Sequence, residues 1–163
     1  MSIRFSADEV LEMAEQIERN GGVFYRHAAE FCEEGREMLL DLAKEEDKHL
    51  ALFQGMRSKL SPEQADTAVF DPDGEGSLYL NAMADGHVFD LRGGDPAKIL
   101  KGNESILDIC QIAIHAEKDS IVFFAGMKDM VPESLGKEAM DVLIREEMKH
   151  IRWLHDRLTK EGE

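Results

Sequence analysis

Cysteine, long apolar runs and proline are all scarce in this chain of 163 residues. Its two cysteines, Cys32 and Cys110, allow at most one disulfide, and a domain of this length does not need one, which favours free thiols in a reducing compartment. No apolar run approaches the roughly 20 residues that a membrane-spanning helix requires. The N-terminal sequence lacks the basic and apolar blocks of a signal peptide. We therefore expect a cytoplasmic protein.

Basic residues are also few for a chain of this size. There are 19 lysines and arginines against 34 aspartates and glutamates, which gives a formal net charge of -15. Such a surface repels phosphate groups, so we expect neither nucleic acid nor an anionic membrane as a partner. With 33% charged and 43% hydrophobic residues, the composition is typical of one globular domain, here 1–163.

Prolines occur only at positions 62, 72, 96 and 132, and each lies where a helical pattern has ended. Between them, apolar residues recur at three- and four-residue steps, which is typical of amphipathic helices. This pattern predicts long helices over about 6–32, 35–60, 103–130 and 134–160. The crossover, about 61–102, includes a possible short helix over 78–89. We therefore predict an all-α four-helix bundle, made of two αα-hairpins joined by one long crossover.

The two predicted hairpins share one sequence plan. Residues 17–25 read IERNGGVFY and residues 116–124 read AEKDSIVFF. Residues 44–50 read KEEDKHL and residues 145–151 read REEMKHI. The first match has an offset of 99 residues and the second an offset of 101. Because each half repeats the other, we expect the hairpins to pack about a pseudo-twofold axis.

Each predicted helix has an apolar stripe that one glutamate interrupts near its middle, and two of the helices add a histidine three residues later. Unpaired burial of a carboxylate costs several kcal/mol, and protonating all four at neutral pH would need large upward pKa shifts. No lysine or arginine lies near them on these stripes. Two divalent cations would neutralise the four carboxylates, so we favour a metal site over six surface residues. The predicted ligands are Glu18, Glu46, His49, Glu117, Glu147 and His150.

The spacing of these residues suits metal binding. Residues i and i+3 of a helix lie about 4.5 Å apart along its axis, so both can reach one site. Each Glu-x-x-His pair offers an oxygen that can bridge two ions and a nitrogen for one of them. This is the ligand set of di-iron and di-manganese carboxylate bundles. Oxygen ligands with imidazole suit iron, manganese or a mixed pair, and we expect two iron ions.

The strings IERNGGVFY, KEEDKH, AEKDSIVFF and REEMKH resemble the rubrerythrin branch of the ferritin-like superfamily, and the likeness covers all four helices. The resemblance implies a ferritin-like bundle with a carboxylate-bridged di-iron centre that reacts with oxygen or peroxide. It also implies the role of each ligand: bridging for Glu46 and Glu147, terminal for Glu18 and Glu117, and nitrogen-donating for His49 and His150.

The chain departs from that family in three ways. It has no rubredoxin-like Cys₄ domain, so electrons must come from a separate donor protein. Ser120 stands where peroxide-reducing members tend to carry an extra carboxylate, which counts against rubrerythrin-type peroxidase activity. The chain also stops soon after the fourth helix, whereas cage-forming ferritins extend into a fifth.

We therefore predict a di-iron carboxylate oxidoreductase that reacts with O2 or H2O2 and forms a homodimer. The alternatives are an iron-handling ferroxidase or storage protein, and a metal-stabilised interaction module without turnover. Tyr25, seven residues after Glu18, is a candidate hydrogen-bond donor beside the metal or a redox-active phenol, although a core tyrosine with a satisfied hydroxyl is the favoured interpretation. Glu45 and Glu146 either orient a neighbouring group or face water.

Overall fold

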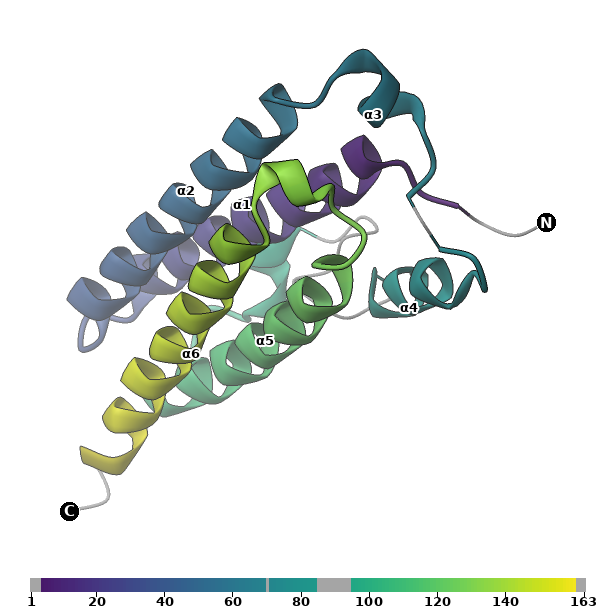
Figure 1. Cartoon of the computed structure of the whole chain (residues 1–163). Coiled ribbons are helices and arrows are strands. Elements are labelled where there is room, and N and C mark those ends of the chain that lie inside the picture. Colours follow the sequence, from purple (N-terminus) through teal and green to yellow (C-terminus); the bar gives the residue numbers. More distant parts are fainter. Residues whose placement is uncertain (1–3, 70, 85–94, 161–163) are drawn as a thin grey trace.

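Four long helices lie side by side in the computed structural model, which describes residues 4–69, 71–84 and 95–160 (Figure 1). They are α1 (Ala7–Phe31), α2 (Arg36–Ser58), α5 (Ile106–Met127) and α6 (Lys137–Lys160). Helices α1 and α2 form one hairpin and α5 and α6 the other. The predicted all-α bundle of two αα-hairpins with a long crossover is therefore confirmed. Within the described ranges, the structure contains no helix that is both long enough and apolar enough to span a membrane.

Side-chain caps explain where α1 and α5 begin. Ser6 and Glu9 form the capping box that their spacing indicates: Glu9 N donates to Ser6 Oγ at 3.2 Å and Ser6 N donates to Glu9 Oε2 at 2.7 Å. Helix α5 begins at Ile106 rather than near 103, because Ser105 forms a second capping box with Asp108.

The turn between α5 and α6 is longer than the sequence pattern predicts. Helix α5 ends at Met127 rather than near 130, and α6 begins at Lys137 rather than near 134. The intervening residues include a short 3-10 helix, η2 (Glu133–Leu135), which ends at Gly136. Gly136 has a φ of 95°, a conformation that glycine adopts without steric cost.

The crossover contains the short helices α3 (Pro62–Asp66), α4 (Glu75–Ala84) and η1 (Pro96–Ile99). The helix expected over 78–89 begins earlier, at Glu75, because the Asp71 carboxylate accepts hydrogen bonds from the backbone N–H groups of Gly76 and Ser77. Residues 85–89 of that expected helix lie outside the described residues.

Helix α4 packs against the C-terminal half of α5 (Figure 1). The hydroxyl of Tyr79 donates to the backbone carbonyl of Val122. A Cβ added to Gly126 would lie 2.1 Å from the Tyr79 ring, so the ring can lie against α5 only because position 126 is glycine. This part of the crossover is thereby held against the second hairpin, whereas α3 and η1 pack against α1.

The apolar stripes of the four long helices meet in one core. Burying each large side chain contributes about 1.5–3 kcal/mol to the stability of the fold. Cys32 and Cys110 are free thiols buried in this core, as expected from their positions on the stripes. The largest fully buried side chains include Phe24, Tyr25, Phe53, Phe123, Phe124, Leu11, Ile17, Leu39 and Leu42.

Candidate metal centre

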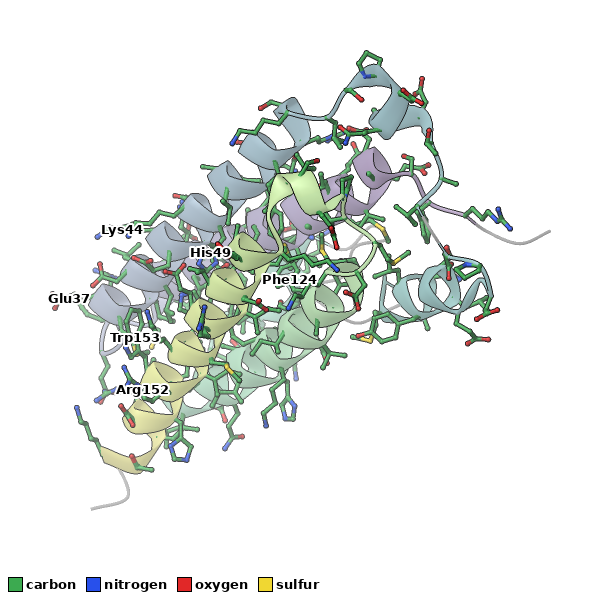
Figure 2. All side chains as sticks on the ribbon, in the orientation of Figure 1. Glu37, Lys44, His49, Phe124, Arg152 and Trp153 are labelled. Atoms are coloured by element: carbon green, nitrogen blue, oxygen red, sulfur yellow. The ribbon has the colours of Figure 1, made fainter. Side chains whose placement is uncertain are left out.

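The middle of this apolar core contains ionisable side chains. One glutamate comes from each of α1 and α5, and a glutamate with a histidine comes from each of α2 and α6. All are at most 2% exposed to solvent. Figure 2 labels one of them, His49. The structure thus brings together every residue that the sequence predicts as a ligand: Glu18, Glu46, His49, Glu117, Glu147 and His150.

Within the described residues, these side chains form two overlapping groups that could each hold a metal ion. One comprises Glu18, Glu46, His49 and Glu147, and the other comprises Glu46, Glu117, Glu147 and His150. In each group, one ligand atom per residue lies within 4.8 Å of the others. Glu46 and Glu147 belong to both groups, which is the position that a bridging carboxylate requires.

His49 faces carboxylates from three helices. Its Nδ1 atom lies 2.9 Å from Glu147 Oε1, 3.5 Å from Glu18 Oε2 and 3.8 Å from Glu46 Oε2. The His49 ring stacks on the ring of His150, with centroids 5.4 Å apart and planes at 19°. One nitrogen of His49 therefore points into the carboxylate cluster.

His150 has the equivalent surroundings in the second group. Its Nδ1 atom lies 3.1 Å from Glu147 Oε2, 3.4 Å from Glu117 Oε1 and 3.5 Å from Glu46 Oε1. The two histidines therefore face the cluster through the same ring atom, as the sequence repeat predicts.

Several of these polar atoms lack an aligned hydrogen bond although they are close to one another. Among the described residues, the unsatisfied buried atoms include Nδ1 of both histidines, one oxygen each of Glu18 and Glu46, and both oxygens of Glu147. Buried polar atoms are almost always satisfied, so such a concentration requires an explanation. A cation between them would satisfy them together. Carboxylate oxygens with imidazole nitrogens are a donor set suited to first-row transition metals. The residues present therefore fit a pair of metal ions.

The sequence matches no family model and no curated protein. The structure is nevertheless similar to a solved structure from Thermotoga maritima that is described as a ferritin-like diiron-carboxylate protein, with a TM-score of 0.75. The chain has the ferritin-like fold. The two chains are 24% identical in sequence, and the match covers 97% of each. The ferritin-like architecture expected from the sequence is thereby confirmed.

Helix α1 of this ferritin-like bundle comes unusually close to one bridging candidate. A Cβ added to Gly21 would lie 3.2 Å from Cδ and 3.5 Å from Oε2 of Glu46. Glycine at this position leaves the space that the Glu46 carboxylate occupies. We did not single out Gly21 from the sequence, although its place next to Gly22 in IERNGGVFY is a visible signal.

Ser120 is the repeat counterpart of Gly21. It is 2% exposed, and its hydroxyl donates to the backbone carbonyl of Ala116 at 3.0 Å. The position is therefore inside the bundle, one turn from Glu117, but the side chain there supplies no carboxylate.

Burial and mutual repulsion control the pKa values of the terminal glutamates. Removal from water raises the pKa of Glu18 well above its ordinary value, and the negative charges of Glu147 and Glu46 raise it further. The same causes raise the pKa of Glu117 well above its ordinary value. Both terminal glutamates therefore tend to hold a proton when no cation is bound.

The histidines show the opposite balance. Burial by itself lowers the pKa of His49, but close contacts with Glu147, Glu18 and Glu46 outweigh burial and raise it. Burial likewise lowers the pKa of His150, and its contacts with three carboxylates raise it. Both imidazoles therefore favour the charged form in the metal-free protein.

Glu46 and Glu147, which belong to both groups, complete the charge balance. Burial raises the pKa of Glu46, but its contacts with Glu18 and the two histidines outweigh burial and lower it. The pKa of Glu147 is also lowered, because its contacts with both histidines outweigh burial and the charge of Glu46. Two imidazolium ions then balance two carboxylates. Two divalent cations balance four carboxylates equally well, so protons and metal ions compete for one neutral cluster.

Glu146 orients His49 from outside the cluster. His49 Nε2–H donates to Glu146 Oε2 at 3.0 Å, which leaves Nδ1 directed at the carboxylates. Such outer partners fix the orientation of a metal-binding imidazole. The repeat counterpart, Glu45, instead pairs with Lys48 at 2.5 Å. The sequence leaves open whether these two glutamates orient a neighbouring group or face water. The structure shows that Glu146 orients a histidine, whereas Glu45 pairs with a lysine of its own helix.

Tyr25 lies beside the cluster rather than only in the core. Its hydroxyl donates to Glu117 across the bundle, and its side chain is fully buried. Burial and the nearby negative charge of Glu117 raise its pKa well above the ordinary value, so the phenol keeps its proton. Phe124, its repeat counterpart, has no hydroxyl and packs on Phe53 with ring centroids 5.3 Å apart.

Proposed function

We propose that this protein is a rubrerythrin-like di-iron carboxylate oxidoreductase that reacts with oxygen or hydrogen peroxide. The main support is the buried cluster of carboxylates and imidazoles whose unsatisfied atoms converge on two overlapping positions. Iron is supported by the ligand chemistry and by the solved structure of the same fold, which is described as a diiron-carboxylate protein. The electrons that complete a cycle would come from a separate donor protein.

The chain's own residues would hold the two ions in distinct ways. Glu46 and Glu147 belong to both groups and would bridge the ions. Glu18 and Glu117 would each bind one ion, and each ion would also receive one imidazole nitrogen. When bound, the iron pair would supply two-electron redox chemistry toward a small oxidant.

The surroundings would restrict what reaches the ions. Because the ligands are at most 2% exposed, bulk water is excluded and only a small molecule could approach. The phenol of Tyr25 would hold a proton at Oη, beside the terminal ligand Glu117. The environment therefore suits O2 or H2O2 better than a large organic substrate.

The test is anaerobic reconstitution with ferrous iron, followed by metal analysis and stopped-flow absorption after mixing with O2 or H2O2. We expect two iron ions per chain and a fast spectral change with at least one oxidant. A Glu46→Gln/Glu147→Gln variant is the matched control, because it keeps the shape of the site but removes the two shared carboxylates. A metal-replete protein that is inert to both oxidants would exclude an oxidoreductase.

The same samples separate the alternatives. Ferrous oxidation followed by growth of a mineral core, seen by light scattering, would indicate iron storage. A large loss of stability on chelation together with redox silence would indicate a metal-stabilised interaction module. Manganese or a mixed pair would be identified directly by metal analysis of protein purified without added iron.

We also propose a homodimer in the cytoplasm, from the family resemblance and the scarcity of cysteine. Sedimentation analysis of the full chain measures the oligomeric state. A monomer over the whole concentration range would exclude the dimer.

A further inference from the structure

The chain's single tryptophan lies between the candidate metal centre and solvent. Trp153 follows His150 by one turn of α6, and the two rings contact each other, with centroids 5.8 Å apart and planes at 35°. His150 is 2% exposed, whereas Trp153 is 37% exposed. Two conjugated rings therefore connect the buried cluster to the surface. Figure 2 labels Trp153 toward the C-terminal end of α6.

Trp153 also lines a surface hollow of about 440 Å³ between the start of α2 and the last turns of α6. Its lining combines an apolar part with three carboxylates and one guanidinium. The residues of this Trp153 hollow are Glu34, Gly35, Glu37, Met38, Asp41, Trp153 and Arg157.

The lining of the Trp153 hollow has three carboxylates and one guanidinium, and two of the carboxylates are paired with cations, which leaves a small net negative charge. Arg157 pairs with Glu34 at 2.9 Å, and Asp41 pairs with Lys44 at the rim at 2.7 Å. Glu37 adds a further carboxylate, and the whole chain has a net charge of -15. A positively charged partner is therefore attracted here, and an anionic one is repelled.

We propose that the Trp153 hollow is the docking surface for a positively charged one-electron donor, and that Trp153 and His150 form the path for the electrons. The inference rests on the proposed function, because the path needs a redox-active metal at its inner end. An exposed tryptophan with an acidic rim suits a small, transient redox interface. Because electron tunnelling weakens steeply with distance, contact between the two rings favours this route.

The electron count is simple. Each donor molecule is oxidised by one electron, so two docking events supply the two electrons that convert a ferric pair to a ferrous pair. No covalent bond forms or breaks in this step. The donor class is a cationic one-electron carrier.

The other hairpin offers no comparable path. The repeat counterpart of Trp153 is Leu52, an aliphatic side chain that is half-buried. In the described ranges, the structure shows no ring contact between His49 and an exposed aromatic side chain. The route to the surface therefore belongs to the second hairpin alone.

Docking is tested on the metal-free protein by quenching of the Trp153 fluorescence. Oxidised methyl viologen is the cationic probe and iodide the anionic one. We expect quenching by the viologen to be roughly tenfold stronger than by iodide at low salt, and to weaken steeply as salt is added. Glu37→Lys should reduce it severalfold, whereas Glu63→Lys on α3, at the other end of the bundle, should not. Equal quenching by both probes, or insensitivity to Glu37→Lys, overturns the docking surface.

The electron path is tested on the oxidised, iron-loaded protein by stopped-flow reduction with the methyl viologen radical cation. Trp153→Leu should slow reduction about tenfold or more, while Trp153→Phe, which keeps a ring, should slow it less. Val142→Ala, another exposed apolar position on α6, is the control and should not change the rate. Unchanged reduction of Trp153→Leu overturns the path.

The docking test is independent of the proposed function, whereas the test of the electron path needs bound iron. If the protein binds no iron, both the proposed function and the electron path are overturned, while the quenching result still decides docking. If a second copy of the chain covers the hollow, Trp153 emission will shift to the blue and quenching will decrease as protein concentration rises, and this result also overturns donor docking.

Discussion

The two hairpins of the bundle hold equivalent ligands but surround them differently. The α1–α2 hairpin supplies Glu18, Glu46 and His49, and the α5–α6 hairpin supplies Glu117, Glu147 and His150. Both histidines face the cluster through Nδ1. The candidate ligands therefore follow the sequence repeat closely, as two equivalent metal ions would require of ligand type and spacing.

The contacts around the ligands do not follow the repeat. Glu146 of α6 orients His49 of α2, whereas Glu45 pairs with a neighbouring lysine. Tyr25 of α1 donates to Glu117 of α5, whereas Phe124 has no hydroxyl to donate. Each supporting contact runs from one hairpin to a ligand of the other. Each hairpin therefore supports a candidate ligand of the other, so the cluster also joins the hairpins.

The largest expected effect is on the number of bound metal ions, and it distinguishes the shared ligands from the terminal ones. Glu147→Gln should cost the protein both ions, because Glu147 belongs to both groups of candidate ligands. Glu18→Gln should cost only one ion, because Glu18 belongs to one group. Metal analysis after reconstitution counts the bound ions. Loss of the same number of ions in the two variants would contradict the assignment of shared and terminal roles.

Metal removal should reverse the pH dependence of stability. In the metal-free protein, the pKa values of Glu18 and Glu117 are raised above the ordinary 4.5, and those of His49 and His150 above the ordinary 6.5. A group with a raised pKa contributes stability that is complete below its ordinary pKa and is lost as pH rises towards its pKa in the folded protein, so the Tm should fall as pH rises above the ordinary histidine value of 6.5.

Bound metal should give the opposite trend, because fewer protons must leave the ligands at high pH. The loaded protein should also be more stable by several kcal/mol when free metal is well above its Kd. Thermal unfolding of chelated and loaded samples over the same pH series measures both effects. A chelated protein whose Tm rises with pH would contradict the protonation scheme.

A smaller effect compares the two outer glutamates. Glu146→Gln should weaken metal binding about 10- to 100-fold, because the carboxylate that orients His49 is lost. Glu45→Gln removes only a pair with Lys48 and should leave affinity nearly unchanged. Competition titration with a chromophoric chelator gives both affinities. If the two variants behave alike, the halves are equivalent in solution.

The smallest expected effect is on stability and on the absorption spectrum, and it compares Tyr25 with its repeat counterpart Phe124. Tyr25→Phe removes one hydrogen bond to Glu117 and should cost about 0.5–1.5 kcal/mol of stability. It should also alter the absorption spectrum of the iron-loaded site, since Glu117 is a proposed ligand. A Phe124→Leu variant, which removes a buried ring but no hydrogen bond to a proposed ligand, serves as the control for packing and should leave the spectrum unchanged. A spectrum that is unaffected by Tyr25→Phe would show that the Tyr25 hydroxyl does not influence the metal site.

Much of the fold and all of the candidate ligands were predictable, because both depend on local spacing. Apolar residues at helical steps indicate the four helices. Glu46 and His49 lie on the same face of their helix because they are three residues apart, independently of how the helices pack. The helix start near 103 was predicted too early although Ser105 and Asp108 have the same capping-box spacing as Ser6 and Glu9, so this local signal was missed. The start near 134 was predicted too early because the turn that ends at Gly136 depends on backbone conformation.

The support around the ligands could not be predicted from spacing. Glu45 and Glu146 have the same local sequence environment, yet only Glu146 reaches a histidine. The partner of Tyr25 is 92 residues away in the chain, on the other hairpin. Such contacts depend on how the helices are rotated and displaced relative to one another, which local sequence does not record.

Local sequence is sufficient to place the helices, their duplication and the glutamates and histidines at their centres, because helical periodicity relates each of these features to neighbours a few residues away. Packing between the hairpins instead selects which outer side chains contact those residues and leaves Trp153 partly exposed. These features depend on the packing of one hairpin against the other, where small differences in helix position choose between side chains that are equivalent in the repeat.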